Sequence, residues 1–291
     1  MRPYIPDFMG EDWPVVDPDL EINAGLVEWW PCFERGGITV HGIKQGINGT
    51  MTGMDPATDW VRNRDGYALD FITNDYVTIP NSPDLNFGHT TYDDPLTVSA
   101  WFMMRDATNF RAILKDAFAQ YMLGTGAEVL YWSFSDWSQA SLKYQQRWTA
   151  ALTGYQGQLI HACGTYDGRG GANAYLGMHV YVNGQLADAS FFAGANYVAM
   201  EPGAGALEFG RYSTQYMDGQ LSNVRIWRRG LNASEVAELA WHPWSGLWVP
   251  SGRTTIIVPA APSGFAGKFL GLQSPAEVLG LPSPKEVLGV A

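Results

Sequence analysis

Cysteine is scarce in this chain of 291 residues, and so are charged side chains. Cys32 and Cys163 are the only two cysteines, so the chain can form one disulfide at most and has no cysteine spacing typical of a metal or redox centre. Charged residues make up 16% of the sequence, and 18 basic against 29 acidic side chains give a net charge of −11. Binding to a nucleic-acid backbone or an anionic membrane surface needs clustered Lys and Arg, so we expect neither as a partner.

Long apolar segments are also missing. No run of 18 apolar residues occurs, so the sequence predicts no helix inserted in a membrane. The first seven residues contain two prolines and an acid where a signal peptide would begin its apolar stretch. We therefore expect no cleavable signal peptide, unless the sequence is that of a mature form.

Aromatic residues (13%), 33 glycines and 17 prolines are abundant instead, which favours short strands joined by tight turns. Leu96, Val98, Ala100 and Phe102 recur with period two and predict a strand with one apolar face. Many segments of this kind predict an all-β fold, either a sandwich or a jelly roll.

Two short motifs add detail to this prediction. Asn183-Gly184 is a type I′ turn pair between two apolar runs and predicts a β-hairpin. Asn232, followed three residues later by Glu235, has the pattern of a capping box and predicts one short helix that ends before Pro243.

The two ends differ from the centre in composition. Residues 1–22 are rich in proline and acids and predict an extended N-terminal arm, before a domain at 23–246. Residues 247–291 form a C-terminal arm, in which a nonapeptide at 270–278 is repeated at 279–287. One interpretation of this arm is a frayed terminus; the other is an assembly arm that docks through its regularly spaced apolar residues Leu270, Leu272, Val278, Leu279, Leu281, Val287 and Leu288.

Residues 25–245 resemble the laminin G-like, concanavalin A-like lectin/glucanase jelly-roll family. The most specific stretch is Gly-Gln-Leu-Ser-Asn-Val-Arg-Ile-Trp at 219–227. Further similar segments occur in the family's order, at 25–31, 67–71, 75–80, 96–101, 161–167 and 181–184. The resemblance implies a two-sheet antiparallel jelly-roll sandwich. In this family, loops at one rim bind glycans or proteins, often with calcium.

The sequence departs from the family pattern at the positions of a disulfide and of a calcium site. Pentraxin-like relatives join by a disulfide the strands that here hold Ser99 and Cys163, so the resemblance implies that Cys163 is a buried free thiol. Cys32, on a different strand, is expected to be free as well. The same relatives bind calcium through a Glu-Gln-Asp cluster where this chain has Arg-Tyr-Ser-Thr at 211–214, so that site is expected to be lost. We therefore expect no cofactor, with Asp116 as a candidate ligand should calcium bind.

Catalytic patterns are missing too. The glucanase branch of the superfamily carries Glu-x-Asp-x-Glu or Glu-x-Asp-x-x-Glu on one strand, and neither spacing occurs here. We expect no enzyme. Aromatic residues among polar ones are instead candidates for glycan binding, namely Trp137, Tyr144 and Trp148. Filling of the jelly-roll interior and a subunit interface are the alternatives for these three side chains.

Fold and targeting point in different directions, because this fold works mostly outside cells whereas the chain shows no signal peptide and no disulfide. A virion protein resolves the conflict, since it assembles in the host cytoplasm and is released by lysis. Residues 242–250 also resemble a stretch of laminin G-like proteins encoded by tailed phages.

The leading hypothesis is a non-enzymatic, homo-oligomeric phage structural protein, a capsid decoration or tail-associated adhesin. Its partners would be the major capsid protein or tail proteins, together with a cell-surface glycan. The alternatives are an extracellular bacterial carbohydrate-binding lectin and a glycosidase-like enzyme.

Overall fold

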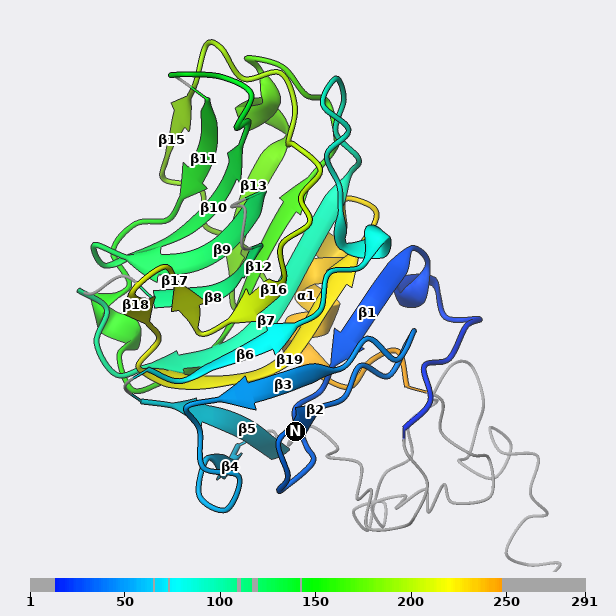
Figure 1. Ribbon diagram of the computed structural model, residues 1–291, viewed down its shortest axis with the longest axis vertical. Helices are drawn as coiled ribbons and strands as arrows, with labels where there is room; N and C mark the ends of the chain where they lie inside the picture. Colours follow the sequence, from blue (N-terminus) through cyan, green and yellow to red (C-terminus); the bar gives the residue numbers. More distant parts are fainter. Residues whose placement is uncertain are drawn as a thin grey trace, which may run out of the picture. The chain divides into compact units, whose positions relative to one another are not determined.

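The computed structural model describes residues 14–247, apart from residues 65, 73, 109–110, 117–119 and 142, and for residues 111–116 it describes the backbone alone. Within this part the chain forms two large antiparallel sheets, a small two-stranded sheet and one α-helix (Figure 1). The all-β jelly-roll prediction is confirmed. Among the described residues, no helix has the length and apolar character needed to cross a membrane.

The first sheet contains eight strands. Its order is β14 (Gln185–Leu186), β13 (Met178–Val182), β12 (Leu159–Tyr166), β7 (Leu96–Met104), β19 (Gly219–Trp227), β5 (Gly66–Phe71) and β4 (Trp60–Asn63), and β1 (Leu26–Trp30) also pairs with β19. Strands far apart in sequence, such as β7 and β19, are therefore neighbours in this sheet.

The second sheet contains nine strands. Its order is β15 (Ser190–Ala193), β11 (Tyr144–Trp148), β10 (Val129–Ser135), β9 (Tyr121–Gly126), β8 (Arg111–Asp116), β16 (Leu207–Phe209), β6 (Tyr76–Ile79), β3 (Gly49–Thr52) and β2 (Thr39–Val40). A separate hairpin pairs β17 (Arg211–Tyr212) with β18 (Gln215–Tyr216). Short 3-10 turns lie at Glu21–Asn23, Pro83–Leu85, Thr153–Tyr155 and Ala174–Gly177.

The main core lies between the inner faces of the two large sheets. The predicted apolar face of β7 is buried there, with Leu96, Val98 and Ala100 fully covered. Trp132 and Phe134 of β10 approach the same core from the other sheet. At about 25 cal/mol per Å² of apolar surface, this sandwich interior supplies most of the favourable free energy of folding.

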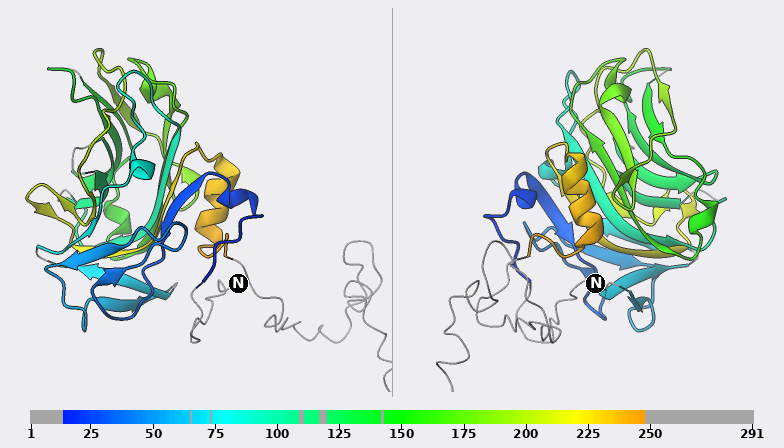
Figure 2. Two further views of the ribbon diagram at one scale, coloured as in Figure 1. Left: turned by 45° about the vertical axis from the view of Figure 1, so that its right-hand side comes forward. Right: turned by 180° about the vertical axis from the view of Figure 1, so that it is seen from behind.

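A second apolar cluster lies on the outer side of the eight-stranded sheet. There α1 (Ala233–Trp241) lies against the sheet (Figure 2, right). Its Val236 and Leu239 pack with residues such as Trp29 and Trp227 of the sheet. The predicted capping box begins this helix: Asn232 Oδ1 accepts two backbone N–H groups, and Glu235 accepts the backbone N–H of Asn232.

The two ends of the described chain meet beside this cluster. Val16 pairs antiparallel with Leu247, and Asn23 Nδ2 donates to the carbonyl oxygens of Asp17 and Gly246 at 2.6 and 2.7 Å. Residues 14–22 of the predicted arm therefore lie against the domain. The rest of both predicted arms lies outside the described residues, including Leu270, Leu272, Val278, Leu279, Leu281, Val287 and Leu288, and their assembly role stays a prediction.

Candidate functional site

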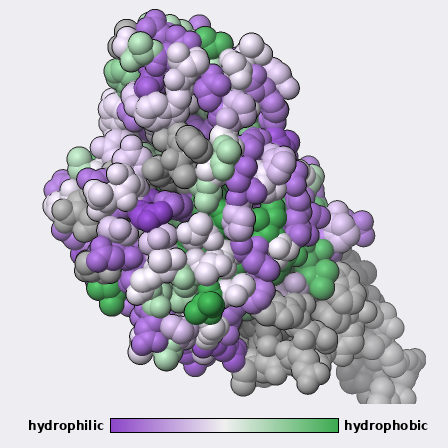
Figure 3. Space-filling view, in the orientation of Figure 1, coloured by the Kyte–Doolittle hydropathy of each residue, from purple (hydrophilic) through white to green (hydrophobic). Residues whose placement is uncertain are grey.

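The outer face of the nine-stranded sheet differs in chemistry from its inner face. Alternation along β10 sends Trp132 and Phe134 into the core and turns Ser133 and Ser135 to the opposite side of the sheet, where both remain buried, 5% and 3% exposed. The adjacent strand β11 pairs with β10 in an antiparallel register, so its outward residues lie directly beside these serines. Hydrophilic and neutral side chains dominate the surface in Figure 3, where hydrophobic residues form small separate patches.

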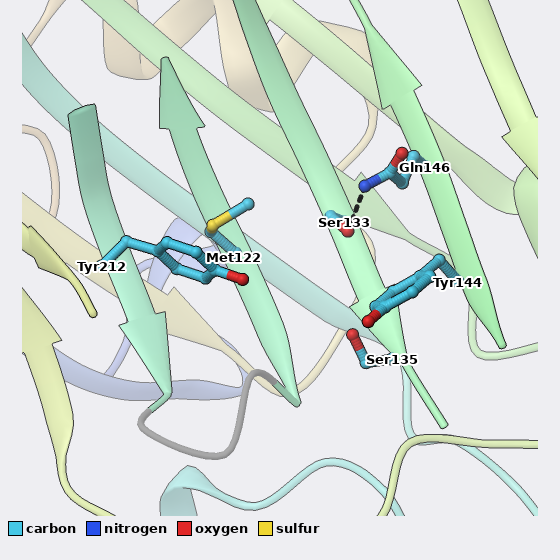
Figure 4. Close-up of a pocket in the computed structure, with 6 residues that line it drawn as sticks. All are labelled: Met122, Ser133, Ser135, Tyr144, Gln146 and Tyr212. Atoms are coloured by element: carbon cyan, nitrogen blue, oxygen red, sulfur yellow. Dashed lines mark hydrogen bonds between the residues drawn. The ribbon is translucent and has the colours of Figure 1, made fainter. Parts of the chain in front are cut away.

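A cavity of about 160 Å³ opens on this outer face, across β9, β10 and β11 (Figure 4). It is lined by Met122, Ser133, Ser135, Tyr144, Gln146 and Tyr212. Gln146 Nε2 donates to Ser133 Oγ at 3.1 Å, which orients the amide beside the cavity. Pockets for drug-sized ligands measure roughly 300–1,000 Å³, so this cavity suits a single ring-sized group.

Tyr212 reaches the cavity from the β17–β18 hairpin and not from the sheet itself. The hairpin is held by Arg211, which pairs with Glu208 and stacks its guanidinium 3.6 Å from the centroid of the Tyr76 ring. Burial, and after it the neighbouring Tyr144, raises the pKa of Tyr212. The phenol therefore keeps its proton at neutral pH.

None of the six lining side chains carries a formal charge at neutral pH, and together they offer hydroxyls, an amide, a thioether and two aromatic rings. Hydroxyls and amides exchange hydrogen bonds with a polyhydroxylated ligand, while aromatic rings cover its apolar C–H surface. The arrangement is suited to recognise a neutral sugar ring.

The three residues predicted for glycan binding all lie along the β10–β11 hairpin. Tyr144 lines the cavity. Trp137 is 50% exposed and meets Tyr144 edge to face, with ring centroids 6.3 Å apart. Trp148 packs against Tyr131 at the other end of β11, outside the cavity lining. The structure brings the first two together and separates the third, and a role in binding stays a prediction for all three.

Five of the six lining residues were not predicted as site residues from the sequence, namely Met122, Ser133, Ser135, Gln146 and Tyr212. The two serines had a detectable signal, because they alternate with the apolar residues of β10. Tyr212 had none, since only the folded position of its hairpin carries the side chain to the cavity.

The arrangement closest to a catalytic pair lies elsewhere. Ser99 Oγ and His161 Nε2 are 2.8 Å apart on the outer side of the eight-stranded sheet, beneath Trp101. Both side chains are buried, and burial, followed by the charge of Arg225, lowers the pKa of His161 to about 3. This pair therefore stays neutral and out of reach of a substrate, and it stabilises the pairing of β7 with β12 instead.

The residues at the family's calcium position do not fit a cation. Arg211 brings a guanidinium there and pairs with Glu208. Across the described part of the chain, no three His, Cys, Asp or Glu side chains gather where they could hold a metal ion. The side chain of Asp116 lies outside the described residues, so its role as a ligand is untested.

A sequence profile of the concanavalin A-like lectin/glucanases superfamily matches residues 71–237, more than half of the chain. No curated protein sequence matches.

Several solved structures share the fold. The binding domain of Paraclostridial Mosquitocidal Protein 1 is 15% identical, with a TM-score of 0.57 over 76% of this chain and 52% of its own. The binding domain of botulinum neurotoxin serotype G is 16% identical, with a TM-score of 0.51 over 74% and 50%. A Trypanosoma rangeli sialidase, solved with 2,3-difluorosialic acid, is 15% identical, with a TM-score of 0.50 over 75% and 33%. The chain spans about half the length of the toxin domains, and identities this low establish the fold alone.

Proposed function

Because the chain belongs to the concanavalin A-like lectin/glucanases superfamily, we propose that it is a carbohydrate-binding protein whose site is the cavity on the outer face of the nine-stranded sheet. The observation that carries this proposal is the cavity lining, in which Tyr144 and Tyr212 flank hydroxyl and amide groups without any charge. Solved relatives with this fold include two toxin binding domains, which is compatible with a binding role.

Site variants test this proposal. We expect Tyr144→Ala and Tyr212→Ala each to weaken binding of a neutral oligosaccharide at least tenfold, which corresponds to 1.4 kcal/mol. Tyr155→Ala removes an exposed tyrosine outside the cavity lining and is the matched control. Titration calorimetry on sugars selected from a glycan array gives the affinities. Absence of binding to any sugar, or full binding by both site variants, would refute the proposed site.

We propose binding without hydrolysis. A retaining glycosidase needs two carboxylates about 5–5.5 Å apart across the sugar, and none of the six described lining residues is a carboxylate. Incubation of the full chain with the bound sugars, followed by chromatography of the products, checks this. If the chain cleaves a bound sugar at an enzymatic rate and Tyr144→Ala abolishes the cleavage, the protein is a glycosidase and the proposal of binding without hydrolysis is wrong.

For the cellular setting we propose a virion protein, a phage capsid decoration or tail adhesin that displays the cavity outward. The support is geometric. The meeting point of Val16 and Leu247 lies with the cluster outside the eight-stranded sheet, whereas the cavity opens on the outer face of the other sheet. A domain attached at that point would present its cavity away from the attachment.

Particle binding tests the virion setting. We expect the full chain to form defined oligomers or to decorate tailed-phage particles, and the chain without residues 249–291 to do neither, as read by mass photometry and negative-stain imaging. If both forms are monomers that bind sugars but no particle, the protein is a free extracellular lectin and the virion proposal is abandoned.

A further inference from the structure

Trp137 is an exposed aromatic side chain on a well-anchored loop. Trp137 is the second residue after β10, and the residue between them, Asp136, is fully buried. The Asp136 carboxylate accepts the backbone N–H of Ser138 at 3.0 Å and that of Val198 at 2.9 Å. These bonds fix the start of the loop, so the indole is held outward beside the cavity at a defined position and its placement costs little entropy on binding.

A lysine ammonium lies over this indole. Lys143 Nζ is 3.7 Å from the centroid of the Trp137 ring and 5.8 Å from that of Tyr144, the cavity-lining tyrosine. No ion pair among the described residues includes Lys143, and the carboxylate of Asp136 is occupied by backbone N–H groups. The two rings thus hold a positive charge at the edge of an otherwise uncharged cavity.

We propose that Trp137 and Lys143 form a second subsite, which binds the carboxylate of an acidic sugar linked to the ring in the cavity. The inference rests on the proposed carbohydrate binding and adds the ligand class: a glycan that carries a carboxylate. The ammonium is already held in place by the indole, so the ligand's carboxylate gains a charge-assisted hydrogen bond without ordering a free lysine side chain.

The test compares acidic oligosaccharides with their carboxyl-reduced forms, which keep the same skeleton and lose the charge. Sialyl, glucuronyl and galacturonyl oligosaccharides serve as probes against the full chain. We expect at least one acidic probe to bind about fivefold tighter than its reduced form, the upper end for an exposed charge pair. High salt should reduce this preference, because ions screen exposed charges.

Variants at the lysine separate charge from folding. Lys143→Gln should abolish the preference for the acidic probe over its reduced form, and Lys143→Arg should retain that preference. Lys44→Gln removes an exposed lysine from another loop and is the matched control for net charge. Trp137→Ala should weaken binding of the linked acidic probe more than that of a free neutral monosaccharide.

The outcomes distinguish the two proposals. If no probe binds, charged or reduced, the carbohydrate-binding function fails and this inference fails with it. If probes bind with equal affinity in both forms, or if the preference survives Lys143→Gln, the cavity binds sugars and the acidic subsite is wrong.

Discussion

At the scale of single residues, the side chain of Glu28 holds the loop from 43 to 47 in place. Its buried carboxylate accepts four backbone N–H groups, those of Trp29, Lys44, Gln45 and Ile47, at 2.7–3.1 Å. An amide in its place would direct N–H groups at some of these donors and leave them unpaired in the interior. We expect Glu28→Gln to lower the free energy of unfolding by about 2–3 kcal/mol, as for loss of hydrogen bonds to a buried charge.

Urea denaturation measures this loss. The control, Glu21→Gln, changes an exposed carboxylate and should stay within about 0.5 kcal/mol of the wild type. Equal midpoints for Glu28→Gln and wild type would mean that the loop from 43 to 47 does not depend on the carboxylate.

Glu34 gives the protein a pH-dependent stability. Its Oε1 accepts the backbone N–H of His41, while its buried Oε2 has no hydrogen-bond partner. Burial raises the pKa of this carboxyl from 4.5 to about 7. The folded state therefore holds the proton more tightly than the unfolded state, and stability falls as the pH rises from about 4.5 to about 7, then levels off. Over this pH range, the contribution of Glu34 to the free energy of unfolding falls by about 3 kcal/mol.

Glu34→Gln removes this carboxyl. The difference in free energy of unfolding, variant minus wild type, should rise by about 3 kcal/mol between pH 4.5 and pH 7. Above pH 7 this difference should stay constant. Urea titrations of both proteins at several pH values give the difference. Parallel curves across this window would show that the carboxyl has an ordinary pKa.

At the scale of elements, the β13–β14 hairpin and α1 fit together through Gly184. This residue has φ +77°, and a Cβ there would lie 3.0 Å from both Ala237 Cα and Ala240 Cβ of the helix. Gly46 has the same backbone conformation, φ +78°, but no atom within 4 Å of its Cβ position. Alanine at Gly46 should cost about 1–2 kcal/mol from conformation alone, and alanine at Gly184 should cost more because the helix must shift.

Thermal unfolding of both variants checks this difference. Equal losses for Gly184→Ala and Gly46→Ala would contradict a close contact between turn and helix. The Asn183-Gly184 turn itself was predicted from the sequence, and both residues have positive φ as a type I′ turn requires.

The elements that sequence analysis identified are those whose pattern is local. Period-two apolar residues identified β7, and the capping box identified α1. β11 and β15 were missed, because Tyr-Gln-Gln-Arg-Trp has no apolar alternation and all four residues of β15 are exposed. Their strand conformation comes from pairing with β10 and with each other. The candidate site follows the same division: Trp137 and Tyr144 stood out as aromatics among polar residues, whereas Tyr212 depends on long-range folding.

At the scale of the whole molecule, covalent cross-links play no part in stability. Cys32 and Cys163 are both free and buried, and Cys163 lies opposite Ser99 in the adjacent strand. Burial raises the pKa of both thiols, which further lowers their reactivity.

A thiol-reactive dye should therefore label neither cysteine in the folded chain and both in denaturant, and a reductant should leave Tm unchanged. Fast labelling of one thiol under native conditions would show that its region opens readily.

The contact between Val16 and Leu247 also has a mechanical consequence. Tension applied between the segments that enter and leave the domain is borne first by this bridge and by the Asn23 side-chain bonds to Asp17 and Gly246. The two large sheets lie outside that line of force. While the bridge between Val16 and Leu247 holds, a pull on the two segments loads only this bridge and the Asn23 hydrogen bonds. The cavity on the opposite sheet therefore keeps its shape under tension.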